Sequence, residues 1–188
     1  MQTTFYAWLV KKIIPYIRFS TYYTSMRGVK YHKIYDAIEP GDIILTIDKR
    51  KLTTFLIPGD WAHAAVCVSK DKTFEVAEMT HTDYTKSTVA DVCFEADRVR
   101  VLRGNNFTRD YKNKFIEKCK SFDGVPYDDQ FELGIKALSC SELVWASDYE
   151  ERLGLSLKDV AGLGREYISP TGIFKAKHVE LVIDSDSC

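Results

Sequence analysis

The sequence lacks the features that mark metal-binding and disulfide-rich proteins. It contains no CxxC pair, and its five cysteines are an odd number, so neither a zinc ribbon nor a complete disulfide framework is expected. At least one thiol is therefore free, and a reducing compartment is the simpler interpretation. The sequence also has no excess of one charge sign, because 26 Lys and Arg residues nearly balance 27 Asp and Glu residues. This balance argues against a surface dominated by nucleic-acid binding, and no nucleic acid is expected as a partner.

Long apolar runs are missing too. The longest uncharged run near the N-terminus has about ten residues, whereas a helix needs about 20 apolar residues to cross a bilayer. The first residues also lack the order of basic, apolar and small-residue regions that is typical of a signal peptide. We therefore expect a soluble protein, with the cytoplasm favoured as its compartment.

Two regions differ in composition. Residues 1–35 carry apolar side chains at roughly helical spacing with basic residues between them, which indicates an amphipathic helix that Pro15 kinks or ends. Such a helix either packs on its own domain or contacts a membrane surface or a protein partner. We expect an N-terminal helical extension over 1–35 and one main domain over 36–188. The residues behind this pattern are Phe5, Trp8, Leu9, Ile13, Tyr16 and Ile17, with Lys11, Lys12 and Arg18.

The main domain begins with strand-like segments. Two Pro-Gly-Asp turns lead into the runs "IILTI" and "HAAVCV". The polar residues 69–72 precede "KTFEVAEM" and indicate a hairpin, and "DRVRVLR" and "HVELVID" predict two more strands. Two helices are expected, at 109–122 and at 140–153, the second with Gly154 as its C-cap. The layout is α+β, with an antiparallel sheet and the second helix packed on it.

Cys140 opens the second of these helices. Ser139 and Glu142 match the S-x-x-E capping box, which places Cys140 at the first helical position. Unpaired backbone N–H groups and the helix dipole favour a thiolate there, and the same N–H groups could form part of an oxyanion hole. A small buried cysteine without any chemistry produces the same local pattern, and on that pattern alone it is the more common case.

A nucleophilic thiol also needs a base, which is usually histidine. His63 opens a strand among small and apolar neighbours, where a rigid side chain can project into a cleft. Glu78 is the candidate to orient it, because strand alternation places Glu78 on the same face as Phe74 and Val76, and a buried carboxylate needs a partner. The other three histidines are His32, His81 and His178. His81 lies in a polar stretch that is expected to be a loop.

Taken in order, these segments resemble a known family. The order is a Gly-Asp strand, "WAHAAV", "FEVAEM", "DGVPYDDQF", "SCSELVW" and "ISPTGIF", from about Gly41 to Val182. It is similar to the YiiX-like branch of the NlpC-type cysteine peptidase superfamily. The resemblance implies a circularly permuted papain-like fold, in which an antiparallel sheet or barrel packs against the helix carrying the nucleophile. The histidine then comes before the cysteine in the chain.

The resemblance also implies roles for individual residues. Cys140 matches the nucleophile of the family, His63 matches the base, and Glu78 matches the polar residue on the following strand. Tyr127 of the "PYD" element and Trp61 of "WAHAAV" are expected near the substrate. The implied function is a cysteine-dependent amidase or peptidase that works through a thioester acyl-enzyme and requires no metal or cofactor.

Two departures from the family leave the substrate open. Many relatives have an aromatic residue where this chain has Ser139, and residues 1–35 have no counterpart. Cell-wall peptides or another amide are the first expectation. One alternative is a lipid-directed acyltransferase or hydrolase, held at a membrane surface by residues 1–35. Another is a non-catalytic ligand-binding module with the same fold.

Overall fold

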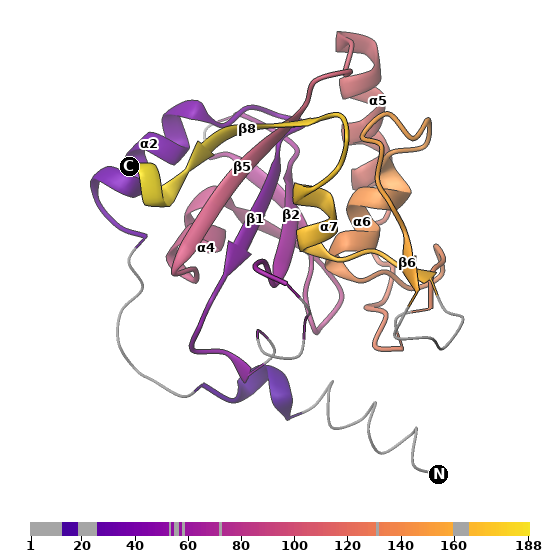
Figure 1. The fold of residues 1–188 in the computed structure, drawn as a ribbon, viewed down its shortest axis with the longest axis horizontal. Helices are drawn as coiled ribbons and strands as arrows, with labels where there is room; N and C mark the ends of the chain where they lie inside the picture. The colour runs from indigo at the N-terminus through magenta and orange to yellow at the C-terminus, as the bar shows by residue number, and fades with distance from the viewer. Residues whose placement is uncertain are drawn as a thin grey trace.

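Six antiparallel strands form one sheet in the order β4-β3-β2-β1-β5-β8 (Figure 1). β1 lies near the middle of the sheet and pairs with β2 on one side and β5 on the other. Two very short strands form a separate ribbon. The strands are β1 (Ile43–Ile47), β2 (His63–Cys67), β3 (Glu75–Met79), β4 (Tyr84–Thr88), β5 (Arg98–Gly104), β6 (Lys158–Asp159), β7 (Glu166–Tyr167) and β8 (Val179–Asp184).

Helices cover the sheet from both sides. In Figure 1, α2 and α4 lie to the left of the central strands, and α5 and α6 lie to their right. The helices are α2 (Val29–Ala37), α4 (Val89–Phe94), α5 (Arg109–Lys120), α6 (Cys140–Ser147) and α7 (Pro170–Phe174), with the 3-10 turns η1 (Ile14–Tyr16) and η2 (Ser185–Ser187).

The computed structural model describes most of the chain, and no helix of this part is long and apolar enough to cross a membrane. Of the expected N-terminal helix, only a short stretch is described, where the chain forms the turn η1 with Pro15 in its first turn. Residues 1–12, including Trp8 and Lys11, lie outside the described residues, whereas the last part of the expected extension belongs to α2. The structure describes residues 13–18, 26–52, 54, 57, 59–71, 73–130, 132–159 and 166–188.

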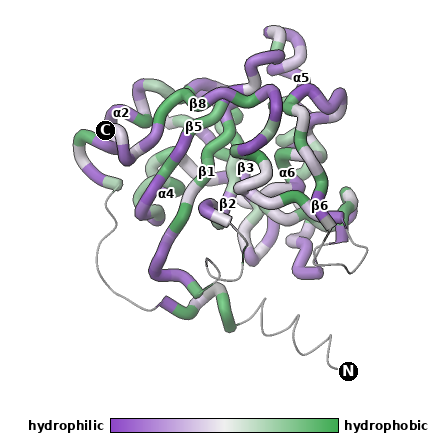
Figure 2. Tube along the Cα trace, in the orientation of Figure 1, coloured by the Kyte–Doolittle hydropathy of each residue, from purple (hydrophilic) through white to green (hydrophobic). Residues whose placement is uncertain are grey.

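Burial on both faces explains why the central strands are almost continuously apolar. Alternate residues of β1 enter two separate cores: Ile43 and Leu45 face α5 and α6, whereas Ile44 faces α2 and α4. Such two-sided burial removes the polar alternation of a half-exposed strand. In Figure 2, β1 is coloured as hydrophobic and the loop that follows it as hydrophilic.

The expected strands around 43–47, 63–67, 75–79, 98–104 and 179–184 are confirmed, as is the hairpin between β2 and β3. The loop expected around His81 is only partly correct, because β4 follows it at once. β4 has the sequence YTKST, and its polar residues give no apolar alternation. It is an edge strand, and its place in the sheet comes from pairing with β3.

The predicted end of the second helix is wrong. α6 ends at Ser147, and Gly154 lies beyond it in a turn rather than at its C-cap. The cause is Asp148, whose Oδ1 accepts hydrogen bonds from the Tyr111 hydroxyl at 2.6 Å and the Arg152 N–H at 2.9 Å. Its Oδ2 accepts one from the Leu153 N–H at 2.9 Å. A buried carboxylate that binds these groups draws the chain out of the helix.

Candidate active site

Cys140 is the first residue of α6, as the capping box predicts. The Ser139 N–H donates to Glu142 Oε2 at 2.7 Å, and the Ser139 hydroxyl accepts from the Glu142 N–H, so the helix start is capped in both directions. Leu143 and Val144 are fully buried and hold the helix against the sheet, where α6 packs on β2. The thiol is therefore presented from a rigid helix end, in the positive field of the helix dipole.

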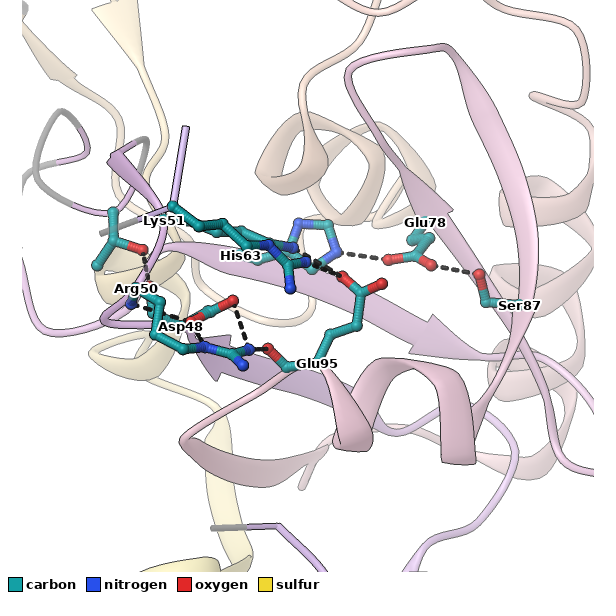
Figure 3. Close-up of polar contacts among 9 residues, drawn as sticks. Asp48, Arg50, Lys51, His63, Glu78, Ser87 and Glu95 are labelled. Carbon is teal, nitrogen blue, oxygen red and sulfur yellow. Dashed lines mark hydrogen bonds and ion pairs between the residues drawn. The ribbon is translucent and has the colours of Figure 1, made fainter. Parts of the chain in front are cut away.

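His63 and Glu78 meet because of the register between their strands. Glu78 on β3 pairs with Ala65 on β2, so His63, two residues before Ala65, is its diagonal neighbour on the same face of the sheet. His63 Nε2 lies 2.7 Å from Glu78 Oε2. Figure 3 shows the imidazole and the carboxylate directed toward each other from the two strands.

Cys140 interacts with the same imidazole. The two groups lie close enough for each to shift the pKa of the other, and because Glu78 occupies Nε2, Nδ1 is the imidazole nitrogen left for the thiol. Burial alone would raise the pKa of Cys140. The hydrogen bond and positive charge of His63, aided by the N–H groups of Ala64 and Ser141, lower this pKa below the ordinary thiol value.

The histidine shows the opposite shift. Burial disfavours the imidazolium, but the hydrogen bonds to Cys140 and Glu78 and their negative charges raise the pKa of His63 to about 10. A lowered thiol pKa and a raised imidazole pKa both favour a thiolate–imidazolium pair over the neutral pair.

Glu78 is ionised although its side chain is only 12% exposed. Burial raises its pKa, whereas the hydrogen bond and charge of His63, the Ser87 hydroxyl and the charge of Lys51 lower it, and the net shift is downward. An ionised carboxylate on Nε2 orients the imidazole and stabilises its charged form. The structure thus brings together Cys140, His63 and Glu78, the three residues singled out in the sequence.

Tyr127 lies beside this group. It forms a parallel bridge with Leu138, two residues before Cys140. Burial, followed by the charges of Cys140 and Glu142, raises its pKa, which is consistent with a phenol close to the thiolate. The side chain is half-buried, so part of it faces solvent.

Trp61 has a different environment. Its side chain is 1% exposed and belongs to the same core as α6. The guanidinium groups of Arg98 and Arg100 lie about 5 Å from the ring centroid, at 5.1 and 5.0 Å. Among the described residues, the indole N–H has no hydrogen-bond partner. Trp61 therefore packs in the core two residues before His63.

The remaining histidines have other surroundings. His81 lies in the turn between β3 and β4, where its Nε2 is 3.1 Å from the Tyr16 hydroxyl. His32 is on α2, and His178 directly precedes β8. Within the described part of the chain, no group of three or more His, Cys, Asp or Glu side chains is arranged to hold a metal ion.

The sequence did not single out Ser87, whose hydroxyl donates to Glu78 Oε1 on the side away from His63 (Figure 3). A serine in a polar stretch carries no pattern that predicts such a contact. Strand parity could have located it only if β4 and its register with β3 had been known.

Comparisons with known proteins identify the fold and the family. The model of the permuted papain-like amidase family (YaeF/YiiX, C92 family) matches residues 37–185. A crystal structure described as metalloprotein yiiX from Escherichia coli O157:H7 is similar with a TM-score of 0.68 and 19% sequence identity, over 78% of this chain and 97% of that one. A comparison with curated proteins gave no match. The predicted α+β fold of the permuted papain-like type is thus confirmed, and the chain belongs to the permuted papain-like amidase family.

Proposed function

We propose that the protein is a cysteine amidase or peptidase in which Cys140 is the nucleophile, His63 the acid and base, and Glu78 the residue that orients His63. One observation carries this proposal. The imidazole of His63 lies 2.7 Å from the buried carboxylate of Glu78, and the same imidazole lowers the pKa of the thiol at the start of α6. A structural cysteine needs neither feature. The family name supports an amide as the bond that is cleaved.

The first half of the reaction forms a thioester. The Cys140 thiolate attacks the carbonyl carbon of the amide, and the carbonyl electron pair moves to the oxygen. The unpaired N–H groups at the start of α6, including that of Cys140, stabilise this oxyanion. His63 then gives the proton on Nδ1 to the leaving nitrogen, the C–N bond breaks, and the amine departs.

The second half releases the acid. His63, now neutral, takes a proton from water as the water oxygen attacks the thioester carbon. The C–S bond breaks, and Cys140 leaves as a thiolate beside the reformed imidazolium. Glu78 stays ionised throughout, because its role is to hold the imidazole and to stabilise its positive charge. Tyr127 forms one wall beside the reacting sulfur.

The thioester is the intermediate that distinguishes this chemistry. We expect that acid-quenched mixtures of the protein with short acyl-amide substrates contain protein whose mass is increased by the acyl group. Digestion and mass spectrometry should locate this group on Cys140, and neutral hydroxylamine should remove it, because hydroxylamine cleaves thioesters.

Two variants sharpen this experiment. Cys140→Ala should show no adduct, whereas Cys188→Ser, which removes the partly exposed thiol near the C-terminus, should show the same adduct as the unchanged protein. An adduct that resists hydroxylamine, or one on another residue, contradicts the proposed mechanism. An adduct formed from lipid esters but from no amide favours the lipid-directed alternative.

A further inference from the structure

Glu78 is held from two sides by a chain of polar side chains that crosses three neighbouring strands. His63 on β2 and Ser87 on β4 flank it on β3. Glu78 pairs with Thr85 in the register of β3 and β4, so Ser87, two residues further, is a diagonal neighbour on the same face. His63 has the equivalent diagonal position on the other side. The three side chains therefore form one line across the sheet (Figure 3).

Each carboxylate oxygen of Glu78 has its own partner. Oε2 lies 2.7 Å from His63 Nε2, and Oε1 accepts a hydrogen bond from the Ser87 hydroxyl. With both oxygens bound, the carboxylate cannot rotate away from the imidazole without breaking a charge-assisted hydrogen bond. The Ser87 hydroxyl donates to the ionised form of Glu78 and so stabilises it against the effect of burial.

Ser87 is itself held firmly in place. β4 pairs with β3 along its whole length, and the next residue, Thr88, is the N-cap of α4. Thr88 Oγ1 accepts from the Asp91 N–H at 3.2 Å, and Asp91 Oδ2 accepts from the Thr88 N–H at 2.9 Å. A capping box thus fixes the end of the strand directly after Ser87, which leaves its short side chain little freedom.

We infer that Ser87 is a positioning residue of the active site, the fourth member of a Ser87–Glu78–His63–Cys140 chain. This inference rests on the proposed function and extends it by one strand. Ser87 touches neither the sulfur nor the substrate. It acts through Glu78, by keeping that carboxylate ionised and directed at His63, which in turn keeps Cys140 a thiolate.

The neighbouring hydroxyl on β4 offers a matched control. Thr85 pairs directly with Glu78, yet its hydroxyl contacts Thr80 Oγ1 at 3.0 Å and the Asp83 carbonyl at 3.2 Å. Removing it in Thr85→Val deletes a hydroxyl from the same strand and the same face without changing the bonds of Glu78. A merely structural role for Ser87 predicts similar results for both substitutions.

The test is the pH dependence of Cys140 alkylation by iodoacetamide, followed on the Cys140 peptide by mass spectrometry. In Ser87→Ala, Glu78 stabilises the imidazolium less well. The midpoint pH of Cys140 alkylation should therefore increase by about half a pH unit or more. Ser87→Thr should restore the original profile, because threonine keeps the hydroxyl and suits a strand. Thr85→Val should leave the profile unchanged. Ser87→Val also lacks the hydroxyl and should shift the profile in the same direction as Ser87→Ala. Thermal unfolding checks that each variant is folded.

The outcomes separate this inference from the function on which it rests. If the unchanged protein alkylates with an ordinary thiol pKa, the proposed function fails. If that profile is shifted to low pH but Ser87→Ala and Ser87→Val leave it in place, the inference about Ser87 alone is overturned. An equal shift in Thr85→Val also overturns it, because the effect then comes from β4 as a whole.

Discussion

Replacing Cys140 by alanine should abolish amide hydrolysis, with kcat reduced by about 10⁴-fold or more. The sulfur is the atom that forms the thioester, and the methyl group of alanine cannot act as a nucleophile. Alanine is a good first residue for a helix, and the capping box of Ser139 and Glu142 does not involve the thiol. The variant should therefore stay folded, and steady-state kinetics together with thermal unfolding separate lost chemistry from lost structure.

The other cysteines provide the comparison. Cys67, Cys93 and Cys119 are buried, and burial raises the pKa of each to about 12. Within the part of the chain that the structure describes, no imidazole offsets this effect. Replacing Cys119 by alanine should cost some stability but leave kcat within a small factor of the original. A folded Cys140→Ala protein that keeps more than about 1% of kcat would refute the assignment of Cys140 as the nucleophile.

Replacing His63 by alanine should have two effects that can be measured apart. Hydrolysis should fall by about 10³-fold or more, because the acid and base of both half-reactions is lost. The pKa of Cys140 should also rise, because burial then acts without the counter-charge. Burial raises the pKa of Cys67, Cys93 and Cys119, which shows the direction expected for Cys140 in this variant. Alkylation of Cys140 at neutral pH should become slow and should recover only in alkaline solution.

His81→Gln is the matched control for this substitution. His81 lies near the end of β3 and contacts the Tyr16 hydroxyl rather than a thiol. Its loss should change neither the alkylation profile of Cys140 nor the rate of hydrolysis. If His63→Ala leaves the alkylation profile of Cys140 in place, the ion pair between these two residues does not exist in solution.

Local patterns predicted much of the site. Ser139 and Glu142 lie within one helical turn of Cys140, so the cap and the position of the thiol could be inferred from four consecutive residues. Alternation along β3 placed Glu78 on a buried face, and the structure shows this face turned toward His63.

Features that depend on tertiary contacts were not predictable in this way. The end of α6 depends on Tyr111, which donates to Asp148 from a helix far away in the sequence. The partner of Glu78 on β4 depends on the pairing of a polar edge strand, which has no apolar alternation to reveal it. The deep burial of Trp61 similarly follows from how α7 and β5 pack around it. The backbone N–H of Trp61 donates to the Thr171 hydroxyl on α7 at 3.1 Å, and Arg100 of β5 lies over the indole ring.

The most direct test of the central claim is a pH titration of the Cys140 thiolate, measured as the difference in ultraviolet absorbance between the protein and its Cys140→Ala variant. The thiolate–imidazolium pair predicts thiolate absorbance at neutral pH, with a midpoint below the ordinary thiol pKa of about 8.5. Because the pKa of His63 is raised to about 10, the imidazolium should persist until the solution becomes strongly alkaline. A thiolate midpoint at or above about 8.5 would contradict the account, since Cys140 would then be an ordinary buried thiol.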